Sequence, residues 1–186
     1  LRPGATLGVL TEAVSPSDWT KGAKAPKVSL VEYSDFQCPA CGAYYPLVEK
    51  VFADNQDHLD FTYRQFPLPQ HKNALVAAYA SEAAGIQGKF WEMHDLLFKN
   101  QDVWSETDTA TQTFEGYAKD LGLDVQKFKV DSLSQTVKDA VQHDQQTGIS
   151  AGVDSTPSFY LNGKRVQNPR SPEEFQTLID DASSSK

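Results

Sequence analysis

The chain has 186 residues, of which 39% are hydrophobic, so it fits one domain, or one domain with an insertion, around a substantial core. Its net charge of −8 at pH 7 and its pI near 4.9 argue against binding to nucleic acid or to an anionic membrane surface, because both attract basic proteins. We interpret the acidity as favouring solubility. No stretch is long and apolar enough to span a bilayer. The chain begins at Leu1 rather than Met, and we expect a targeting peptide or a membrane anchor to have preceded it.

The first third of the chain predicts a strand, a helix and a strand. Residues 1–25 are polar and rich in Pro and Gly, and predict an N-terminal arm with at most one edge strand. The β-branched run 27–33 predicts a strand, and 39–55 predicts a helix in which Pro46 produces a kink. Residues 58–66 alternate apolar and polar side chains, which predicts a second strand. Short connections make this a βαβ unit with parallel strands.

The middle of the chain changes to a helical period. Apolar side chains recur at helical spacing in four segments: 74–84, 89–99, 114–121 and 133–141. Glycines separate these segments, as expected between helices. The sequence therefore predicts an inserted, all-helical domain over residues 69–149.

The end of the chain returns to strands. An Asn-Gly pair separates the runs 158–161 and 164–167, which predicts a hairpin with a two-residue type I′ turn. An amphipathic helix is predicted to begin at Pro172. The order βαβ, helices, ββα is that of an α/β protein with a thioredoxin fold, whose two halves we place at 26–68 and 150–186.

The only two cysteines, Cys38 and Cys41, lie in the sequence CPAC at the start of the first predicted helix. Two thiols three residues apart indicate either a disulfide that opens and closes or half of a metal site. A closed zinc site needs two more Cys or His ligands at short spacing, and the four histidines are far apart. We therefore favour redox chemistry and expect no metal and no cofactor other than the Cys38–Cys41 disulfide.

The motif gives each cysteine a different role. Cys38 directly precedes the helix, and Pro39 occupies the first helical position, which suits proline. The Cys38 sulfur then faces backbone N–H groups at the positive end of the helix dipole, and this environment favours the thiolate. We expect Cys38 to be the nucleophile. Cys41, beyond Ala40, lies about one turn deeper on the same helix face, and we expect it to be the less exposed, resolving thiol.

Glu32 is the candidate for proton transfer. It lies on the same face of the first predicted strand as Val28 and Leu30, where a carboxylate is costly unless it has a partner or a function. We expect it to exchange a proton with Cys41 during resolution. The alternative is an edge position where Glu32 contacts water.

Thr156 and Pro157 come directly before the predicted strand 158–161. Proline cannot donate a backbone hydrogen bond, so a strand that opens with it leaves a gap at the edge of the sheet, and a cis bond there would let an extended substrate pair with the backbone of Thr156. From the residues alone the bond before Pro157 is trans, because only about one X–Pro bond in twenty is cis. Phe36, close to the cysteines, is predicted to contribute to an apolar substrate groove.

Three separated segments carry a family resemblance: VEYSDFQCPAC at 31–41, GKFWEMHDLLF at 88–98, and Thr156-Pro157 followed by Asn162-Gly163-Lys164. With these segments the chain resembles the DsbA-like thiol-disulfide oxidoreductases, and within them the BdbD-type branch of bacteria. The resemblance implies a thioredoxin fold with a helical insertion, Cys38 as nucleophile, Cys41 as resolving thiol, and a cis bond before Pro157.

The resemblance also implies a biological setting. Members of this family work in the periplasm or at the exterior of the cell envelope, where they oxidise unfolded or reduced secreted proteins. A membrane quinone-linked partner of the DsbB-like or VKOR-like type reoxidises them. We expect a monomer that does not bind nucleic acid.

The chain departs from the family pattern at two positions. The best-known strong oxidants have His where this chain has Ala40, and Asp35 adds a negative charge near Cys38. We therefore expect a less oxidising enzyme. Ser155 stands where glycine is frequent, so the loop before Thr156 is expected to differ in shape.

Two alternatives remain open. Within the same class, the chain is a reductase or an isomerase whose Cys38–Cys41 pair is kept reduced by a dedicated donor. From a different class, it is a module that binds a soft metal such as Cu(I) through two thiolates, or an accessory domain of a membrane protein.

Overall fold

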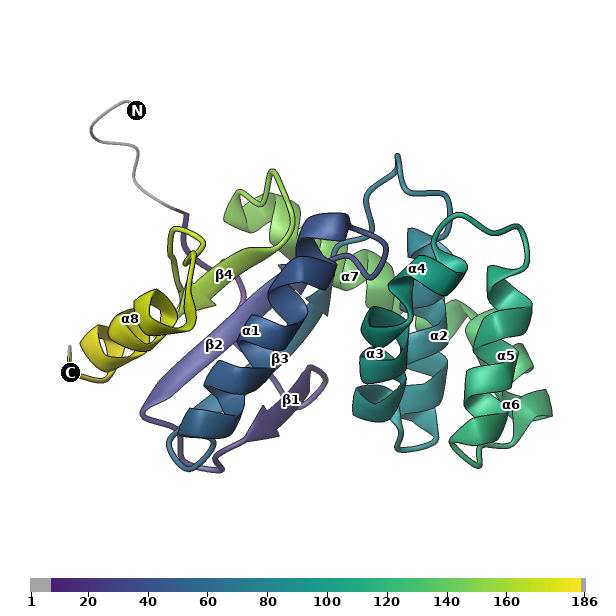
Figure 1. Cartoon of the computed structure of the whole chain (residues 1–186), viewed down its shortest axis with the longest axis horizontal. Coiled ribbons are helices and arrows are strands. Elements are labelled where there is room, and N and C mark those ends of the chain that lie inside the picture. The colour runs from purple at the N-terminus through teal and green to yellow at the C-terminus, as the bar shows by residue number, and fades with distance from the viewer. Residues whose placement is uncertain (1–7, 185–186) are drawn as a thin grey trace. The chain divides into compact units, whose positions relative to one another are not determined.

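The computed structural model describes residues 8–184, which form an α/β structure (Figure 1). The strands are β1 (Trp19–Gly22), β2 (Val28–Ser34), β3 (Leu59–Gln65), β4 (Ser158–Leu161) and β5 (Lys164–Arg165). The helices are α1 (Pro39–Asn55), α2 (Ala74–Ile86), α3 (Phe90–Lys99), α4 (Gln101–Trp104), α5 (Ala110–Asp120), α6 (Val125–Ser132), α7 (Gln135–Ala151) and α8 (Pro172–Ser184). The predicted order βαβ, helices, ββα is confirmed.

The chain divides into two compact units. The sheet unit contains the described residues up to Tyr33, Tyr44–Arg64 and the described residues from Gln146 onward. The helical unit contains Ser34–Ala43 and Gln65–Gln145. These boundaries differ from the predicted insertion 69–149, because the loop and first helical turn that carry both cysteines group with the helical unit.

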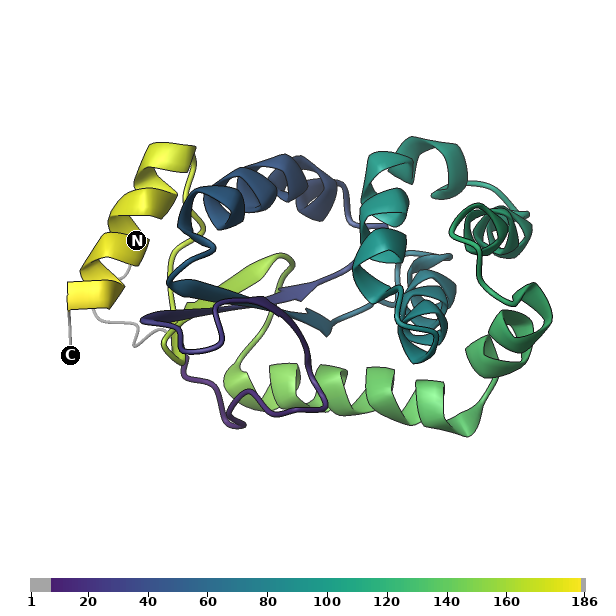
Figure 2. The ribbon, with the colours of Figure 1, turned by 90° about the horizontal axis from the view of Figure 1, so that it is seen from below.

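The five strands are ordered β1-β3-β2-β4-β5. β1 pairs antiparallel with β3, β2 with β4, and β4 with β5. The helices α1 and α8 lie on one face of the sheet, and residues 8–18, the N-terminal segment, lie on the opposite face (Figure 2). On the helix-covered face, the ring of Phe159 lies 5.2 Å from that of Phe175 and 5.6 Å from that of Tyr44, which fixes both helices to β4.

The predicted hairpin is present. Asn162 and Gly163 have φ values of 48° and 81°, and a type I′ turn requires positive φ at both central residues. β5 ends at Arg165 rather than at the predicted Gln167. Beyond it, the backbone N–H of Val166 still donates to the carbonyl of Phe159 at 3.0 Å, and the side chain of Asn168 donates to the carbonyl of Pro157 at 2.7 Å.

In the helical unit, α2 packs against α3, α5 and α6. α2 is rich in buried alanines, which allow the neighbouring helices to approach closely. The indole of Trp104 is fully buried and donates to the carbonyl of Leu97 at 2.9 Å. The predicted stripe 133–141 is only partly correct: Leu133 follows α6 and is 72% exposed, whereas Val137 and Val141 on α7 are buried.

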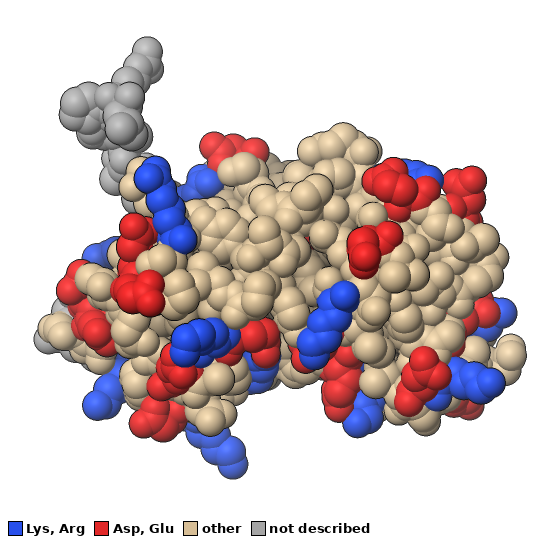
Figure 3. Space-filling view, in the orientation of Figure 1, with Lys and Arg blue, Asp and Glu red and all other residues tan. Residues whose placement is uncertain are grey.

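Acidic and basic side chains are mixed over the surface. On the face drawn in Figure 3, the described Lys and Arg side chains are interspersed with Asp and Glu and form no extended patch of one sign.

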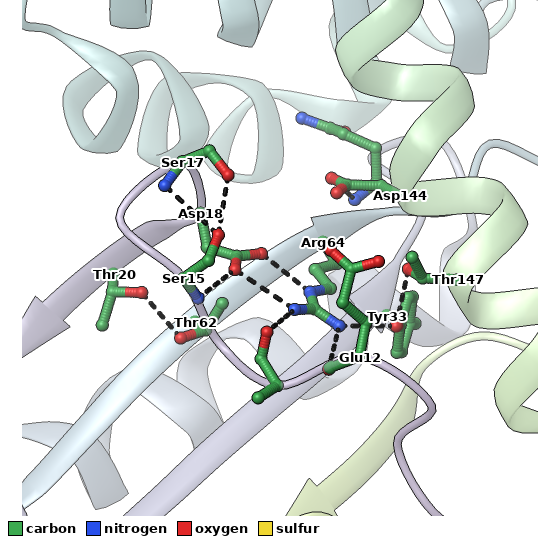
Figure 4. Close-up of polar contacts among 12 residues, drawn as sticks. Glu12, Ser15, Ser17, Asp18, Thr20, Tyr33, Thr62, Arg64, Asp144 and Thr147 are labelled. Carbon is green, nitrogen blue, oxygen red and sulfur yellow. Dashed lines mark hydrogen bonds and ion pairs between the residues drawn. The ribbon is translucent and has the colours of Figure 1, made fainter.

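The N-terminal segment crosses the sheet from one edge to the other. At β5, the backbone of Leu10 donates to Gly163, and further on the segment leads into β1 at the opposite edge. Between these edges the buried guanidinium of Arg64 binds Asp18 through two nitrogens, at 2.7 and 3.1 Å (Figure 4). The same guanidinium donates to the carbonyls of Glu12 and Ala13. The buried cation of Arg64 and the backbone hydrogen bonds at β5 therefore hold the segment on the sheet.

Candidate functional site

The cysteines lie at the start of α1, as the motif predicts. The N–H of Cys38 donates to the carbonyl of Asp35, and the carbonyl of Cys38 accepts the N–H of Gly42, both at 3.1 Å. Cys38 is 7% exposed and Cys41 is 0% exposed, which confirms the predicted difference in depth. Pro39 and Ala40 between them are exposed. The CPAC turn is therefore at the surface, with one thiol at its rim and the other beneath it.

The carboxylate of Asp35 organises the loop before Cys38. Its Oδ1 accepts the N–H of Gln37 at 2.7 Å, and its Oδ2 accepts the N–H of Leu68 at 2.9 Å. The same Oδ2 lies 2.7 Å from Nδ1 of His71. The side chain of Asp35 is fully buried. It therefore joins the loop before the motif to the loop after β3, and it places a negative charge three residues before Cys38.

Two glutamines and an asparagine complete this loop, and the sequence reasoning missed all three. Gln37 donates through Nε2 to the carbonyl of Ser105 at 2.6 Å and accepts the N–H of Asn73 at 2.6 Å. Gln101 donates through Nε2 to two carbonyls, those of Phe36 and Cys38. Gln37 adjoins the motif, which is a local signal. Gln101 and Asn73 are distant in sequence, and no pattern singled them out.

Phe36 is buried rather than available to a substrate. Its ring is 1% exposed and packs 4.9 Å from Phe98 and 5.7 Å from His94. The prediction that Phe36 contributes to a substrate groove is therefore corrected to a packing role. His94 belongs to the same aromatic cluster, with its ring 5.1 Å from that of Phe98.

Glu32 lies in the sheet unit, on β2. It is 4% exposed and pairs with Phe159 of β4, and β2 has a strand on each side. The alternative of a water-exposed edge position is therefore wrong. The role of Glu32 in proton exchange with Cys41 stays a prediction.

Thr156 and Pro157 lie in the sheet unit, immediately before β4, and the peptide bond between them is cis. Both side chains are buried. The carbonyl of Pro157 accepts a hydrogen bond from Asn168. Pairing of a substrate strand with Thr156 stays a prediction.

Among residues 8–184, no group of three or more His, Cys, Asp and Glu side chains is arranged to hold a metal ion. In the same described range, no helix combines the length and the apolar character needed to cross a bilayer.

Comparison with known proteins gives the family. The thioredoxin family model matches residues 15–181. The Na⁺/H⁺ antiporter NhaA 3 of Salinispora tropica is 34% identical over 180 residues, which are 95% of this chain and 27% of that protein. The chain thus spans about a quarter of the length of the curated relatives it matches.

BdbD of Bacillus subtilis superposes with a TM-score of 0.81 at 23% identity, over 97% of this chain and 99% of that one. A thioredoxin-like oxidoreductase of Silicibacter pomeroyi superposes with a TM-score of 0.78 at 22% identity, over 92% and 95% of the two chains. The chain belongs to the thioredoxin family and has the DsbA- and BdbD-like form of its fold.

Proposed function

We propose that this protein is a thiol-disulfide oxidoreductase that transfers the Cys38–Cys41 disulfide to reduced, extracytoplasmic proteins. The observation that carries the proposal is the position of Cys38 at the N-terminus of α1, with Cys41 one turn deeper and less exposed. Backbone N–H groups at a helix N-terminus stabilise a thiolate, and a thiolate is both the better nucleophile and the better leaving group.

The exchange proceeds in two steps. A substrate thiolate attacks Sγ of Cys38, the Cys38–Cys41 bond breaks, and Cys41 leaves as a thiolate. The second thiolate of the substrate then attacks the substrate sulfur of the mixed disulfide and releases Cys38. Two electrons pass from the substrate dithiol to the enzyme, and the substrate leaves oxidised. A membrane quinone-linked partner then accepts the two electrons and restores the disulfide, which is the only redox group that the protein requires.

Two further roles belong to the proposal and rest on the sequence. Glu32 exchanges the proton of Cys41, and the backbone beside Thr156 and Pro157 pairs with the extended substrate. Glu32→Gln should slow formation of the mixed disulfide, the step in which Cys41 leaves as a thiolate and takes up a proton, and should leave alkylation of Cys38 unchanged. Equal rates of mixed-disulfide formation in stopped-flow measurements of parent and variant would remove Glu32 from the mechanism.

The cysteine roles are tested with reduced model peptides. Cys38→Ser should abolish oxidation of a dithiol peptide, whereas Cys41→Ser should accumulate mixed disulfides, visible as a mass gain that reductant reverses. Ala43→Ser adds the same hydroxyl at an exposed position of α1 and should oxidise the peptide at the parent rate. Activity retained by Cys38→Ser would contradict the mechanism.

The direction of electron flow is tested by the reduction potential of the pair in glutathione buffers. A value toward about −120 mV supports a disulfide donor, and a value near about −270 mV identifies a reductant like thioredoxin. The second result would favour the reductase or isomerase alternative.

A second candidate function follows from the curated relatives. Those proteins are named Na⁺/H⁺ antiporters, and the chain matches 27% of the first of them. We infer that this chain is the thioredoxin-like part of a longer membrane protein, in agreement with the accessory-domain alternative. An antibody against the chain should then detect a membrane-bound species several times larger than 20.6 kDa in the source cells. A single extracytoplasmic band of about that mass would reject this second candidate.

A further inference from the structure

The side chain of Gln101, at the start of α4, reaches the backbone of the cysteine motif. Its Nε2 donates to the carbonyl of Phe36 at 2.7 Å and to the carbonyl of Cys38 at 3.0 Å. The carbonyl of Cys38 also accepts the N–H of Gly42, which is the first hydrogen bond of α1. One carboxamide thus fixes two peptide groups of the segment that presents Cys38.

Gly42 leaves the space that this carboxamide occupies. A Cβ at position 42 would lie 2.5 Å from Oε1, 3.0 Å from Cδ and 3.1 Å from Nε2 of Gln101. Glycine is a poor helix former, and Gly42 is not among the glycines with positive φ, so its backbone conformation does not require glycine. Close approach by Gln101 is the physical reason that remains for glycine at this position.

We propose that Gln101 is a positioning residue for the Cys38 thiol, and that Gly42 is required to admit it. This inference rests on the proposed role of Cys38 as the nucleophile. The carbonyl oxygens of Phe36 and Cys38 are the negative ends of peptide dipoles in the segment that presents the sulfur, and a negative dipole end disfavours a thiolate. The Nε2–H groups of Gln101 offset these dipoles and hold Cys38 against the N–H groups at the start of α1.

The effect of Gln101 on the Cys38 thiolate is measured as the rate of Cys38 alkylation. The measurement uses a Cys41→Ser background, in which Cys38 is the remaining thiol. Gln101→Ala should lower the rate of Cys38 alkylation by iodoacetamide at pH 6 by about threefold to tenfold, the effect expected from one hydrogen bond. The pH at which the rate reaches half its maximum should rise accordingly. An unchanged pH profile would overturn the proposal.

Gly42→Ala separates positioning from stability. Its methyl group displaces the flexible end of Gln101, so the alkylation rate should fall as it does in Gln101→Ala. Because alanine is the better helix former, the melting temperature should be retained or raised. The double variant Gly42→Ala/Gln101→Ala should show no further loss, since both changes remove the same contact. If the loss of alkylation rate in the double variant equalled the product of the two single losses, the two changes would not share one cause.

The chain offers matched controls. Gly116→Ala in α5 adds a methyl group where no atom lies within 4 Å, and Gln112→Ala removes an exposed carboxamide from the same helix. Both should keep the parent alkylation profile, and a loss in either would overturn the assignment to Gln101. Peptide oxidation by the protein with both cysteines is measured separately: its absence would reject the proposed function, while the alkylation profiles still decide the role of Gln101.

Discussion

Oδ2 of Asp35 lies 2.7 Å from Nδ1 of His71, and the same carboxylate accepts the backbone N–H groups of Gln37 and Leu68. A fully buried carboxylate thus joins the loop before the CPAC motif to the loop after β3, and it places a negative charge three residues before Cys38. The two effects oppose each other in function, because the contacts order the loop and the charge disfavours a thiolate.

The structural effect predicts a loss of stability in Asp35→Ala. The substitution leaves two backbone N–H groups and an imidazole without their acceptor, and buried donors in this situation cost about 1–3 kcal/mol each. We expect the free energy of unfolding to fall by about 2–4 kcal/mol in urea titrations followed by tryptophan fluorescence. Asp108→Ala is the control, because that side chain is 99% exposed and should unfold like the parent.

The electrostatic effect predicts a change of potential in Asp35→Asn. The amide keeps an acceptor oxygen for the loop but removes the negative charge near Cys38. The thiolate of the reduced enzyme is then stabilised, and the reduction potential should rise by tens of millivolts, where about 30 mV corresponds to a tenfold change in equilibrium constant. Equilibration in glutathione buffers measures it, and a lower potential would show that the charge of Asp35 does not act on Cys38.

Substitution of Ala40 is a second change that is expected to raise the reduction potential of the Cys38–Cys41 pair. Its side chain is exposed within the CPAC turn, so a larger residue is accommodated without displacing the core. Ala40→His adds a group that is partly cationic near neutral pH and should raise the potential, more at pH 6 than at pH 8. Ala40→Gln, which matches the size without the charge, should leave the potential close to that of the parent.

Substitution of Arg64, which is distant in sequence from the cysteines, is expected to lower the free energy of unfolding by a large amount. Burial by itself lowers the pKa of the guanidinium, but hydrogen bonds to Asp18 and Tyr33 outweigh burial and raise it, so Arg64 stays charged. Arg64→Met leaves Asp18 buried without its cation, and removal of one partner of a buried pair typically costs about 3–5 kcal/mol. Urea titration measures the loss.

Two further variants check this interpretation of Arg64. Arg64→Met/Asp18→Leu removes both charges and should recover much of the loss, as the double-mutant cycle requires. Lys50→Met breaks an exposed ion pair with Asp54 and should leave stability almost unchanged. No recovery in the double variant would mean that Arg64 acts chiefly through the carbonyls of Glu12 and Ala13.

Asp60 on β3 is expected to make the stability of the folded protein depend on pH. Burial raises the pKa of this carboxyl above its ordinary value of 3.8, and a hydrogen bond with Ser29 opposes the shift only in part. The folded state therefore holds the proton more tightly than the unfolded state, so this group costs stability as the pH rises above about 4. Asp60→Asn should be more stable than the parent at pH 7, and the difference should shrink toward pH 4. Thermal melts across this range measure it, with the exposed Asp120→Asn as control.

The order of the elements and the position of the thiols were predictable from local sequence patterns. The strand patterns, the Asn-Gly turn and the CPAC motif are local signals, so β2, α1, β3 and the hairpin were predicted to within a few residues. The depth of Cys41 and the burial of Glu32 followed from helical and strand periods. These features depend on residues that are neighbours in the chain.

The surroundings of Cys38, in contrast, depend on residues that are distant in the chain. Gln101 and Asn73 reach the motif across 63 and 36 positions of the chain, and no local period marks a residue whose function is to contact a distant backbone group. The fold also buried Phe36, because helix α3 supplies Phe98 and His94 to cover it. Long-range contacts of single polar and aromatic side chains depend on how helices pack, and packing is set by the whole chain rather than by any segment of it.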